Sequence, residues 1–298
     1  MEMKQRLCVL GGDDRQRYLI RALVRMGYEV CFWGLPGEIE GRGAVAEWRE
    51  AVLNSDAVIL PLPMTVDEVR LSCPQNAVGG MRLALLWECC RGRKVYAGRV
   101  SARVRENAAE AGVLLEDYFA LESLQMRNAV PTVEGALSVA LEALPVTLFG
   151  SEVAVIGYGR IASLLAHRLA ALGARVSVYA RKESDRLHAI LRGMAAYPLR
   201  VGAEGAEDLQ IPKGLRVIFN TVPHRVFSET VLRLLPPDCL LVDLASLPGG
   251  IDLSAAERLG RRAVWATALP GRCFPESAGE ILAVTLGELL EGEGEIKC

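Results

Sequence analysis

The sequence of 298 residues lacks any long uninterrupted apolar run, because charges break its hydrophobic stretches well before membrane-spanning length. Its N-terminus leads from charged residues into a short predicted strand and a turn, so no secretion signal is visible. The formal net charge is only −2, and the 34 basic residues are spread along the chain. These features argue against membrane and nucleic-acid partners, and they favour a cytoplasmic protein.

The 8 cysteines form no C-x-x-C pair, and no histidine stands at metal-ligand spacing from them. We therefore expect free, buried thiols rather than disulfides, and we predict no metal site. Cys8, Cys31 and Cys239 lie within apolar strand patterns.

The most informative segment is residues 151–162, SEVAVIGYGRIA, where a short apolar strand runs into G-x-G-x-x-A and then into a helical pattern. This is the dinucleotide fingerprint in its expected context. Gly157 permits the tight turn, and Gly159 lets a pyrophosphate approach the backbone at a helix N-terminus. A second strand at 175–180 completes the start of a βαβ unit. The cofactor is expected to contact Gly157, Gly159, Arg160 and Ile161.

The end of that second strand lacks the acidic residue that binds the ribose hydroxyls of NAD. Arg181 and Lys182 stand there instead, near the usual spacing of about 20 residues from the first glycine. An acid would repel a 2′-phosphate, whereas Arg181 can bind it and stack on it. NADP is therefore predicted and NAD is less favoured. The alternative is a solvated pair of loop cations.

Strand and helix patterns alternate along the whole chain, which predicts an α/β fold with two doubly wound, Rossmann-like parallel sheets. Residues 1–127 are expected to form a flavodoxin- or Rossmann-like substrate domain, and residues 128–275 the NAD(P)-binding domain. An apolar linker helix opens at Asn128, and a closing helix within 276–298 is expected to pack at the domain interface. Together these elements give the layout of a two-domain dehydrogenase.

Ligands of open parallel sheets gather beyond the carboxyl ends of the strands. The first such turn, GGDDRQ at 11–16, carries Asp13 and Arg15 at a helix N-terminus, so Arg15 is a candidate anchor for a substrate carboxylate. Alternatively, Asp13 or Asp14 caps the helix and Arg15 lies in solvent. On the linker helix, Asn128 and Thr132 are substrate candidates and Glu134 is a candidate general base. The alternative is that Thr132 caps this helix and Glu134 supports its first turn.

Two loops of the second half add further candidates. Thr221, Val222 and Pro223 resemble the loop that passes over the nicotinamide ribose, and His224 follows as an acid, a base or a surface residue. The glycine-rich turn at 243–250 contains Ser246. In one interpretation, the backbone N–H groups of this turn face nicotinamide or a substrate carboxylate. In the other, the segment is a tight turn whose glycines are needed for positive φ.

Four motifs in this order resemble the A-subunit family of dipicolinate synthase from spore-forming bacteria: GGDDRQ at 11–16, NAVPTVEGAL at 128–137, NTVP at 220–223 and LVDLASLPGG at 241–250. The resemblance implies NADP-dependent oxidation of a cyclic dicarboxylate, dihydrodipicolinate or its hydroxytetrahydro precursor, to pyridine-2,6-dicarboxylate. It also implies a flavoprotein-like partner, the B-type subunit of dipicolinate synthase. Synthesis is expected in the mother-cell cytoplasm during sporulation.

Two alternatives remain open. One is a non-catalytic, nucleotide-binding regulatory subunit. The other is an oxidoreductase similar to 2-hydroxyacid or alanine dehydrogenases, although residues 265–274 lack the histidine typical of the hydroxyacid branch. The sequence leaves the oligomeric state open, with a homo-oligomer as one option.

Overall fold

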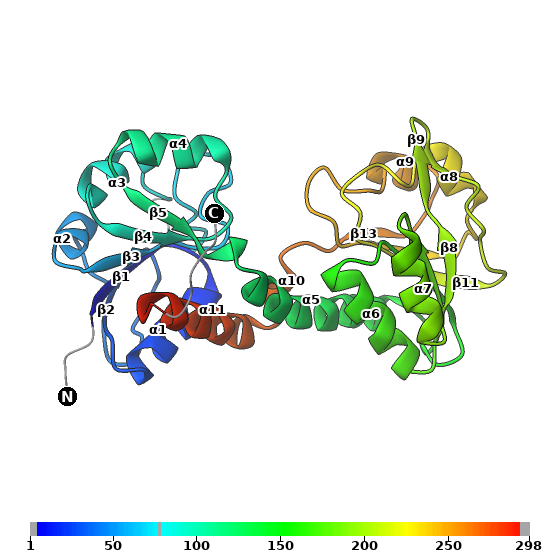
Figure 1. Cartoon of the computed structure of the whole chain (residues 1–298), viewed down its shortest axis with the longest axis horizontal. Coiled ribbons are helices and arrows are strands. Elements are labelled where there is room, and N and C mark those ends of the chain that lie inside the picture. Colours follow the sequence, from blue (N-terminus) through cyan, green and yellow to red (C-terminus); the bar gives the residue numbers. More distant parts are fainter. Residues whose placement is uncertain (1–4, 77–78, 293–298) are drawn as a thin grey trace. The chain divides into compact units, whose positions relative to one another are not determined.

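The computed structural model describes residues 5–76 and 79–292 and divides the chain into two compact units (Figure 1). Unit 1 comprises residues 1–128 and 270–298, and unit 2 comprises residues 129–269. Each unit has a parallel sheet with helices on its faces. The predicted pair of Rossmann-like α/β sheets is confirmed. The chain returns to unit 1 at residue 270, whereas the sequence suggested a return after 275.

Unit 1 contains a five-stranded sheet of order β2-β1-β3-β4-β5 in which all the paired strands are parallel. Parallel neighbours require crossover connections, and helices or long loops supply them here. The strands are β1 (Arg6–Leu10), β2 (Glu29–Trp33), β3 (Ala57–Ile59), β4 (Lys94–Ala97) and β5 (Leu114–Asp117). The helices between them are α1 (Asp14–Arg25), α2 (Trp48–Leu53), α3 (Leu83–Cys90) and α4 (Ala102–Glu110), and the 3-10 turn η1 (Tyr118–Ala120) follows β5.

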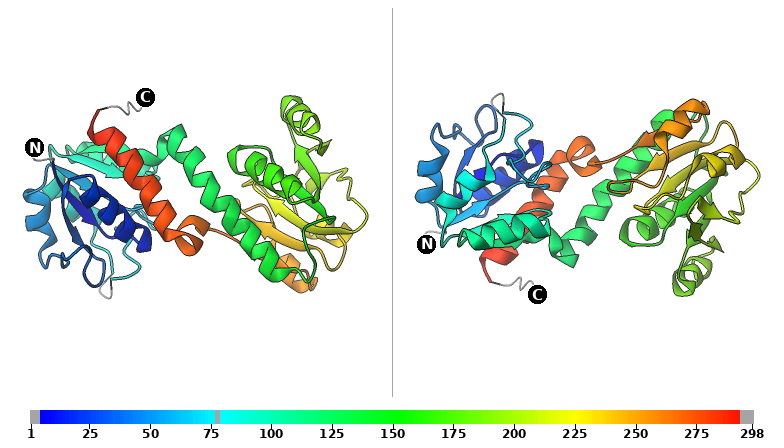
Figure 2. Two further views of the ribbon diagram at one scale, coloured as in Figure 1. Left: turned by 90° about the horizontal axis from the view of Figure 1, so that it is seen from below. Right: turned by 90° about the horizontal axis from the view of Figure 1, so that it is seen from above.

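Alternate residues of these strands enter two different cores, because successive side chains point to opposite faces. Leu7 and Val9 join the core under α1 and α11 (Pro275–Leu290), whereas Cys8 and Leu10 join the core under α2, α3 and α4. Figure 2 shows α1 and α11 side by side in the view from below. A side chain at Gly279 of α11 would overlap the backbone of α1, so this glycine sets their close approach. Of the expected closing helix, residues 293–298 lie outside the described part of the chain.

The linker helix is longer than expected. Helix α5 (Glu122–Ala143) begins in unit 1, before Asn128, and continues into unit 2 with Pro131 inside it. The alternative in which Thr132 caps the helix and Glu134 supports its first turn is therefore wrong. Both residues lie well inside the helix, because it starts upstream of its proline rather than at it.

Unit 2 contains a six-stranded sheet of order β13-β12-β11-β6-β7-β8. The chain enters the middle of the sheet at β6, runs outward to β8 and returns to β11, so the direction of winding reverses between β6 and β11. Such a reversal opens a crevice at the carboxyl ends of the strands. The strands are β6 (Glu152–Ile156), β7 (Arg175–Ala180), β8 (Ala195–Pro198), β11 (Leu215–Asn220), β12 (Leu240–Asp243) and β13 (Ala263–Trp265).

The helices of unit 2 cover both faces of this sheet, with α5 and α6 over one core and α8 and α9 over the other. The remaining elements of unit 2 are α6 (Arg160–Ala171), α7 (Glu183–Leu191), α8 (Glu229–Leu234), α9 (Leu253–Arg258) and the hairpin of β9 (Arg200–Gly202) with β10 (Gly205–Glu207). The short helix α10 (Leu269–Cys273) begins at the last residue of unit 2 and continues into unit 1. Among the described residues, no helix combines the length and apolar character needed to cross a membrane. Nor do the described His, Cys, Asp and Glu side chains form a cluster of three or more that could hold a metal.

Candidate functional site

The candidate site is a cavity of about 620 Å³ in unit 2, at the crevice formed by the reversal of winding. Its walls come from the turn after β6, the end of β7 and the loop after β11. The lining residues are Gly157, Tyr158, Gly159, Ala180, Arg181, Lys182, Asp185, Leu199, Val201, Thr221, Val222, Pro223 and His224. The structure thus gathers most of the predicted cofactor residues around one cavity.

The turn after β6 is built for close approach of a ligand to the backbone. Gly157 has a φ of 97°, and a side chain there would overlap the Thr221 hydroxyl, so only glycine suits the position. Gly159 is the N-cap of α6, and a Cβ built on it would meet nothing within 4 Å. That open space lies at a helix N-terminus, where N–H groups and the helix dipole attract phosphate. Arg160 and Ile161 follow in the first turn of α6.

The end of β7 presents charge to the same cavity. Arg181 and Lys182 are exposed, and Lys182 is the N-cap of α7. Arg186 donates from Nη1 to the carbonyls of Ala180, at 3.0 Å, and Arg181, at 2.8 Å, which fixes the course of the backbone there. Asp185, in the first turn of α7, also lines the cavity. Sequence reasoning missed this carboxylate because it considered the strand end and not the helix that follows.

The NTVP loop is tied to the fingerprint strand. The backbone N–H and the hydroxyl of Thr221 both donate to the Ile156 carbonyl, at 3.0 and 2.8 Å. Asn220, fully buried, donates from Nδ2 to the Val222 carbonyl at 3.0 Å and to Asp243 Oδ1 at 2.8 Å. These bonds hold Thr221, Val222 and Pro223 against the cavity. His224 lines the cavity and is exposed.

Asp243 organises the neighbouring glycine-rich turn. Its carboxylate is 1% exposed and accepts from the backbone N–H groups of Ala245 at 3.1 Å, Gly250 at 2.8 Å and Ile251 at 3.1 Å. Together with the bond from Asn220, this makes Asp243 the acceptor that joins two loops. A carboxylate ending a buried strand, followed by a glycine-rich turn, is the signal that could have identified it. Sequence reasoning named the turn but not this role.

The glycine-rich turn uses its own donors internally. The N–H of Gly249 donates to the Ser246 carbonyl at 2.8 Å, and that of Gly250 is taken by Asp243. Gly249 has a φ of 82°, and a Cβ on Gly250 would lie 2.6 Å from the Val222 carbonyl. The N–H groups of Gly249 and Gly250 are therefore bonded within the chain and do not face a ligand. This agrees with the interpretation of the segment as a tight turn that needs its glycines. Ser246 itself is exposed.

The turn before α1 in unit 1 is closed in a similar way. Asp13 is the N-cap, accepting from the Arg15 N–H at 3.1 Å while its own N–H donates to Gln16 Oε1 at 3.0 Å. The N–H of Gly12 donates to the Ser72 carbonyl at 2.8 Å. The backbone donors that were expected to face an anion are therefore largely engaged within the chain.

Arg15 is not in solvent, as one alternative had it, but is 7% exposed. Its Nε and Nη2 donate to the two carboxylate oxygens of Asp13 at 2.9 and 2.7 Å, and Nη2 also donates to the Leu62 carbonyl. A Cβ on Gly271 would lie 2.8 Å from Arg15 Nε, so the backbone of α10 packs directly on this side chain. Within residues 5–76 and 79–292, Arg15 Nη1 forms no hydrogen bond, which leaves this nitrogen and its two N–H groups for a ligand.

The candidates on α5 are not among the residues that line the cavity. Glu134 is half-exposed and forms an ion pair with Arg168 Nη1 of α6 at 3.2 Å, so it joins two helices of unit 2. Thr132 is buried, and Asn128, the last residue of unit 1 before the crossing, is half-buried.

The fold of this chain is that of the two-domain dehydrogenases. The structure of D-lactate dehydrogenase from Escherichia coli matches with a TM-score of 0.58 at 15% identity, covering 97% of this chain and 98% of that chain, which shows a shared fold. Residues 152–246 match a family model described as NADP oxidoreductase, coenzyme F420-dependent. These findings support a nicotinamide cofactor and an oxidoreductase-like role.

The particular family follows from closer relatives. Residues 6–119 match the model of the N-terminal domain of the dipicolinate synthase A-type subunit. The chain is 32% identical over 289 residues to the A-type subunit of dipicolinate synthase from Bacillus subtilis (strain 168), covering 96% of this chain and 95% of the relative. The crystal structure of the corresponding protein from Bacillus halodurans matches with a TM-score of 0.84 at 27% identity, covering 97% and 98% of the two chains. The chain belongs to the A-subunit family of dipicolinate synthase, so the resemblance is confirmed, and this membership implies a partner chain.

Proposed function

We propose that this chain is the NADP-dependent dehydrogenase component of dipicolinate synthase. The proposal rests on the cavity of unit 2, where Gly157 and Gly159 leave backbone open to a pyrophosphate while Arg181 and Lys182 offer cations to a 2′-phosphate. A bound nicotinamide supplies the hydride acceptor. The substrate would be dihydrodipicolinate or its hydroxytetrahydro precursor, and the gain of aromaticity in pyridine-2,6-dicarboxylate would drive the reaction.

The protein's own residues then bind and orient. Thr221, Val222 and Pro223, held by Asn220, would position the nicotinamide ribose, and His224 at the same cavity would accept the proton released by the ring. Because Glu134 is paired with Arg168, we assign it a positioning role for α6 in place of the general-base role suggested by sequence. Asn128, Thr132 and Ser246 stay candidates for substrate contact.

Arg15 Nη1 is the proposed donor to one substrate carboxylate, with Asp13 holding the guanidinium in place. Arg15→Ala should lower kcat/KM on the order of tenfold, the lower end for one charge-assisted hydrogen bond, while NADP affinity stays unchanged. Steady-state kinetics alongside a thermal melt would measure both effects. Arg17→Ala is the matched control, because Arg17 is a partly exposed arginine of the same helix that bonds instead to the Pro36 carbonyl. Wild-type kcat/KM in a folded Arg15→Ala protein would place the anchor elsewhere.

Asp185 should weaken the proposed 2′-phosphate site, since its carboxylate lines the same cavity as Arg181 and Lys182. Asp185→Asn is expected to raise NADP affinity about two- to fivefold, the range for exposed charge interactions, with little change for NAD. Titration calorimetry with both nucleotides would measure this. Equal gains for NAD and NADP would mean that the carboxylate acts on some other part of the nucleotide.

One experiment tests the proposed reaction. Purified chain, with and without the B-type partner, is mixed with NADP and freshly generated dihydrodipicolinate, and the absorbances of NADPH and of the pyridine product are followed. Both should rise together. NADP binding without NADPH formation, even with the partner present, would instead support a regulatory nucleotide-binding role.

We further propose a flavoprotein-like B-type subunit as the partner and the mother-cell cytoplasm during sporulation as the site of action. Both rest on membership of the dipicolinate synthase family.

A further inference from the structure

A hollow of about 370 Å³ opens in unit 2 at the amino-terminal ends of β6, β7 and β11. The cofactor cavity lies at the carboxyl ends of the same three strands, so the two sites are at opposite ends of the sheet. The walls of the hollow come from the loop between α5 and β6, the start of β7 and the segment that leads into β11. Nothing in the proposed reaction uses it.

Phe149 presents its ring to solvent at this hollow. The residue is 77% exposed, and in the described part of the chain it is the only exposed aromatic residue. A Cβ on Gly173, which follows α6, would lie 2.4 Å from the ring, so the ring packs against that backbone. Val146 at the hollow and Leu172 beside Gly173 are also exposed. Such an exposed apolar patch is typical of an interaction surface.

The loop that carries Phe149 is held by hydrogen bonds. The N–H of Gly150 donates to the Gly173 carbonyl at 2.9 Å, and the N–H of Ser151 donates to the Leu148 carbonyl at 3.0 Å. The Ser151 hydroxyl donates to the Thr147 carbonyl at 2.6 Å. Leu148 is itself buried in the core of unit 2. The exposed ring therefore stands on an ordered loop, and an anchor that is already ordered loses little conformational entropy when it binds.

The rim of the hollow is basic. Lys213 and Arg216 are exposed, and neither forms an ion pair or a hydrogen bond with any residue of the described ranges. The register of β11 against β6 is irregular at Arg216, and an irregularity of this kind re-aims a side chain. Arg175 is paired with Glu152, the one acidic residue among those that line the hollow. Two unpaired cations beside an apolar patch favour an acidic binding partner.

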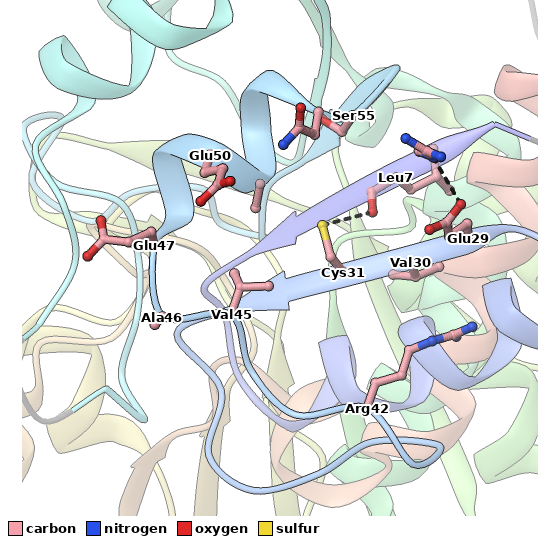
Figure 3. Close-up of a pocket in the computed structure, with 13 residues that line it drawn as sticks. Leu7, Glu29, Val30, Cys31, Arg42, Val45, Ala46, Glu47, Glu50 and Ser55 are labelled. Atoms are coloured by element: carbon pink, nitrogen blue, oxygen red, sulfur yellow. Dashed lines mark hydrogen bonds and ion pairs between the residues drawn. The ribbon is translucent and has the colours of Figure 1, made fainter.

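A cavity of about 540 Å³ in unit 1 has the opposite charge (Figure 3). Glu47 and Glu50 of α2 line it, and neither has an ion pair with another described residue. Its third carboxylate, that of Glu29, is paired with Arg6 at 3.0 Å. No exposed aromatic residue lines this cavity. A partner suited to the hollow in unit 2 is therefore not suited to the cavity in unit 1.

We propose that the hollow with Phe149, Lys213 and Arg216 is the docking surface for the partner chain that membership of the dipicolinate synthase family implies. The inference rests on the proposed B-type partner, but not on the proposed reaction. The contacting segment of the partner is acidic and covers the Phe149 ring with apolar side chains. Buried aromatic and arginine side chains supply much of the affinity of protein interfaces, and opposite charges steer the encounter. Docking at this end of the sheet leaves the cofactor cavity open.

The test measures binding of the purified full-length chain to the purified B-type subunit by biolayer interferometry, without nucleotide or substrate. Phe149→Ala and Arg216→Glu should each weaken the association about tenfold or more, as expected for anchor residues of an interface. Higher salt should weaken the wild-type complex more than the Arg216→Glu complex, because salt screens the attraction between opposite charges.

Three controls should bind as wild type does. Leu191→Ala and Arg192→Glu change an exposed leucine and an exposed arginine at the end of α7 in the same unit, and Glu50→Gln changes the cavity of unit 1. Thermal melts verify that each variant is folded. The NADP affinity of Phe149→Ala should equal that of wild type, because the ring lies at the other end of the sheet.

Each other outcome overturns a defined part of the inference. Wild-type binding by folded Phe149→Ala and Arg216→Glu proteins would overturn the docking surface and leave the partnership intact. No binding by the wild-type chain would overturn the B-type partner and the surface together. Equal weakening by the α7 controls, or a loss of NADP affinity in Phe149→Ala, would show that these substitutions do not act through this surface. Binding that is insensitive to salt would overturn the acidic chemistry assigned to the partner.

Discussion

Replacement of Asp243 by alanine is expected to destabilise unit 2 by about 3–5 kcal/mol, one of the larger losses that a single substitution produces. The carboxylate is almost fully buried and accepts from the Asn220 side chain and from three backbone N–H groups. Each buried donor that loses its partner costs about 1–3 kcal/mol, and partial rehydration keeps the total below the sum. Denaturant unfolding followed by circular dichroism would measure the change.

Asp252→Ala is the matched control. Asp252 is also an aspartate of unit 2, but its principal bond caps α9, where it accepts from the Ala255 N–H at 3.0 Å. The expected loss is about 1 kcal/mol, as for an ordinary helix cap. Because Asp243 joins the NTVP loop to the glycine-rich turn, its variant should also bind NADP more weakly, whereas the Asp252 variant should not. Similar unfolding free energies for the two variants would contradict the role assigned to Asp243.

The sequence predicted the α/β architecture and the cofactor turn because both have strong local signals. The fingerprint at 151–162 is a strand, turn and helix in contiguous residues, and the alternation of strands and helices along the chain predicts parallel sheets. Arg181 and Lys182 were found by counting along the chain from Gly157. The fingerprint, Arg181 and Lys182 all belong to the βαβ unit of β6, α6 and β7, so short-range sequence patterns were enough to find them.

The network around Asp243 was less accessible to sequence reasoning, because its partners come from two strand ends. Asn220 and Asp243 are neighbours only because β11 and β12 pair in register. The burial of Arg15 was missed for the same reason. Its neighbours Leu62 and Gly271 are distant from it in the sequence, and only the fold of unit 1 brings them to its side chain. The start of α5 was misplaced for a different reason: the helix was expected to open at Asn128, and it instead begins at Glu122 and runs through Pro131.

Wild-type chain is expected to bind NADP more tightly than NAD, and Arg181→Asp to reverse that preference. Arg181 is an exposed cation at the cavity wall, at the strand end where an NAD-binding acid would stand. Losing a charge-assisted contact to phosphate costs about 1.5–3 kcal/mol, or roughly 10- to 150-fold in NADP affinity. The new carboxylate adds repulsion toward the 2′-phosphate and offers the NAD ribose an acceptor.

Titration calorimetry of both nucleotides against wild-type, Arg181→Asp and Arg192→Asp proteins would test this. Arg192 is an exposed arginine at the other end of α7, away from the residues that line the cavity, so its variant changes the net charge by the same amount without touching the site. The control should keep the wild-type preference, because screening removes most of the interaction between distant surface charges. If wild-type chain bound NAD and NADP equally, or if Arg192→Asp shifted the preference as much as Arg181→Asp, the 2′-phosphate would not be recognised at the end of β7. Arg181 and Lys182 would then be a solvated pair of loop cations.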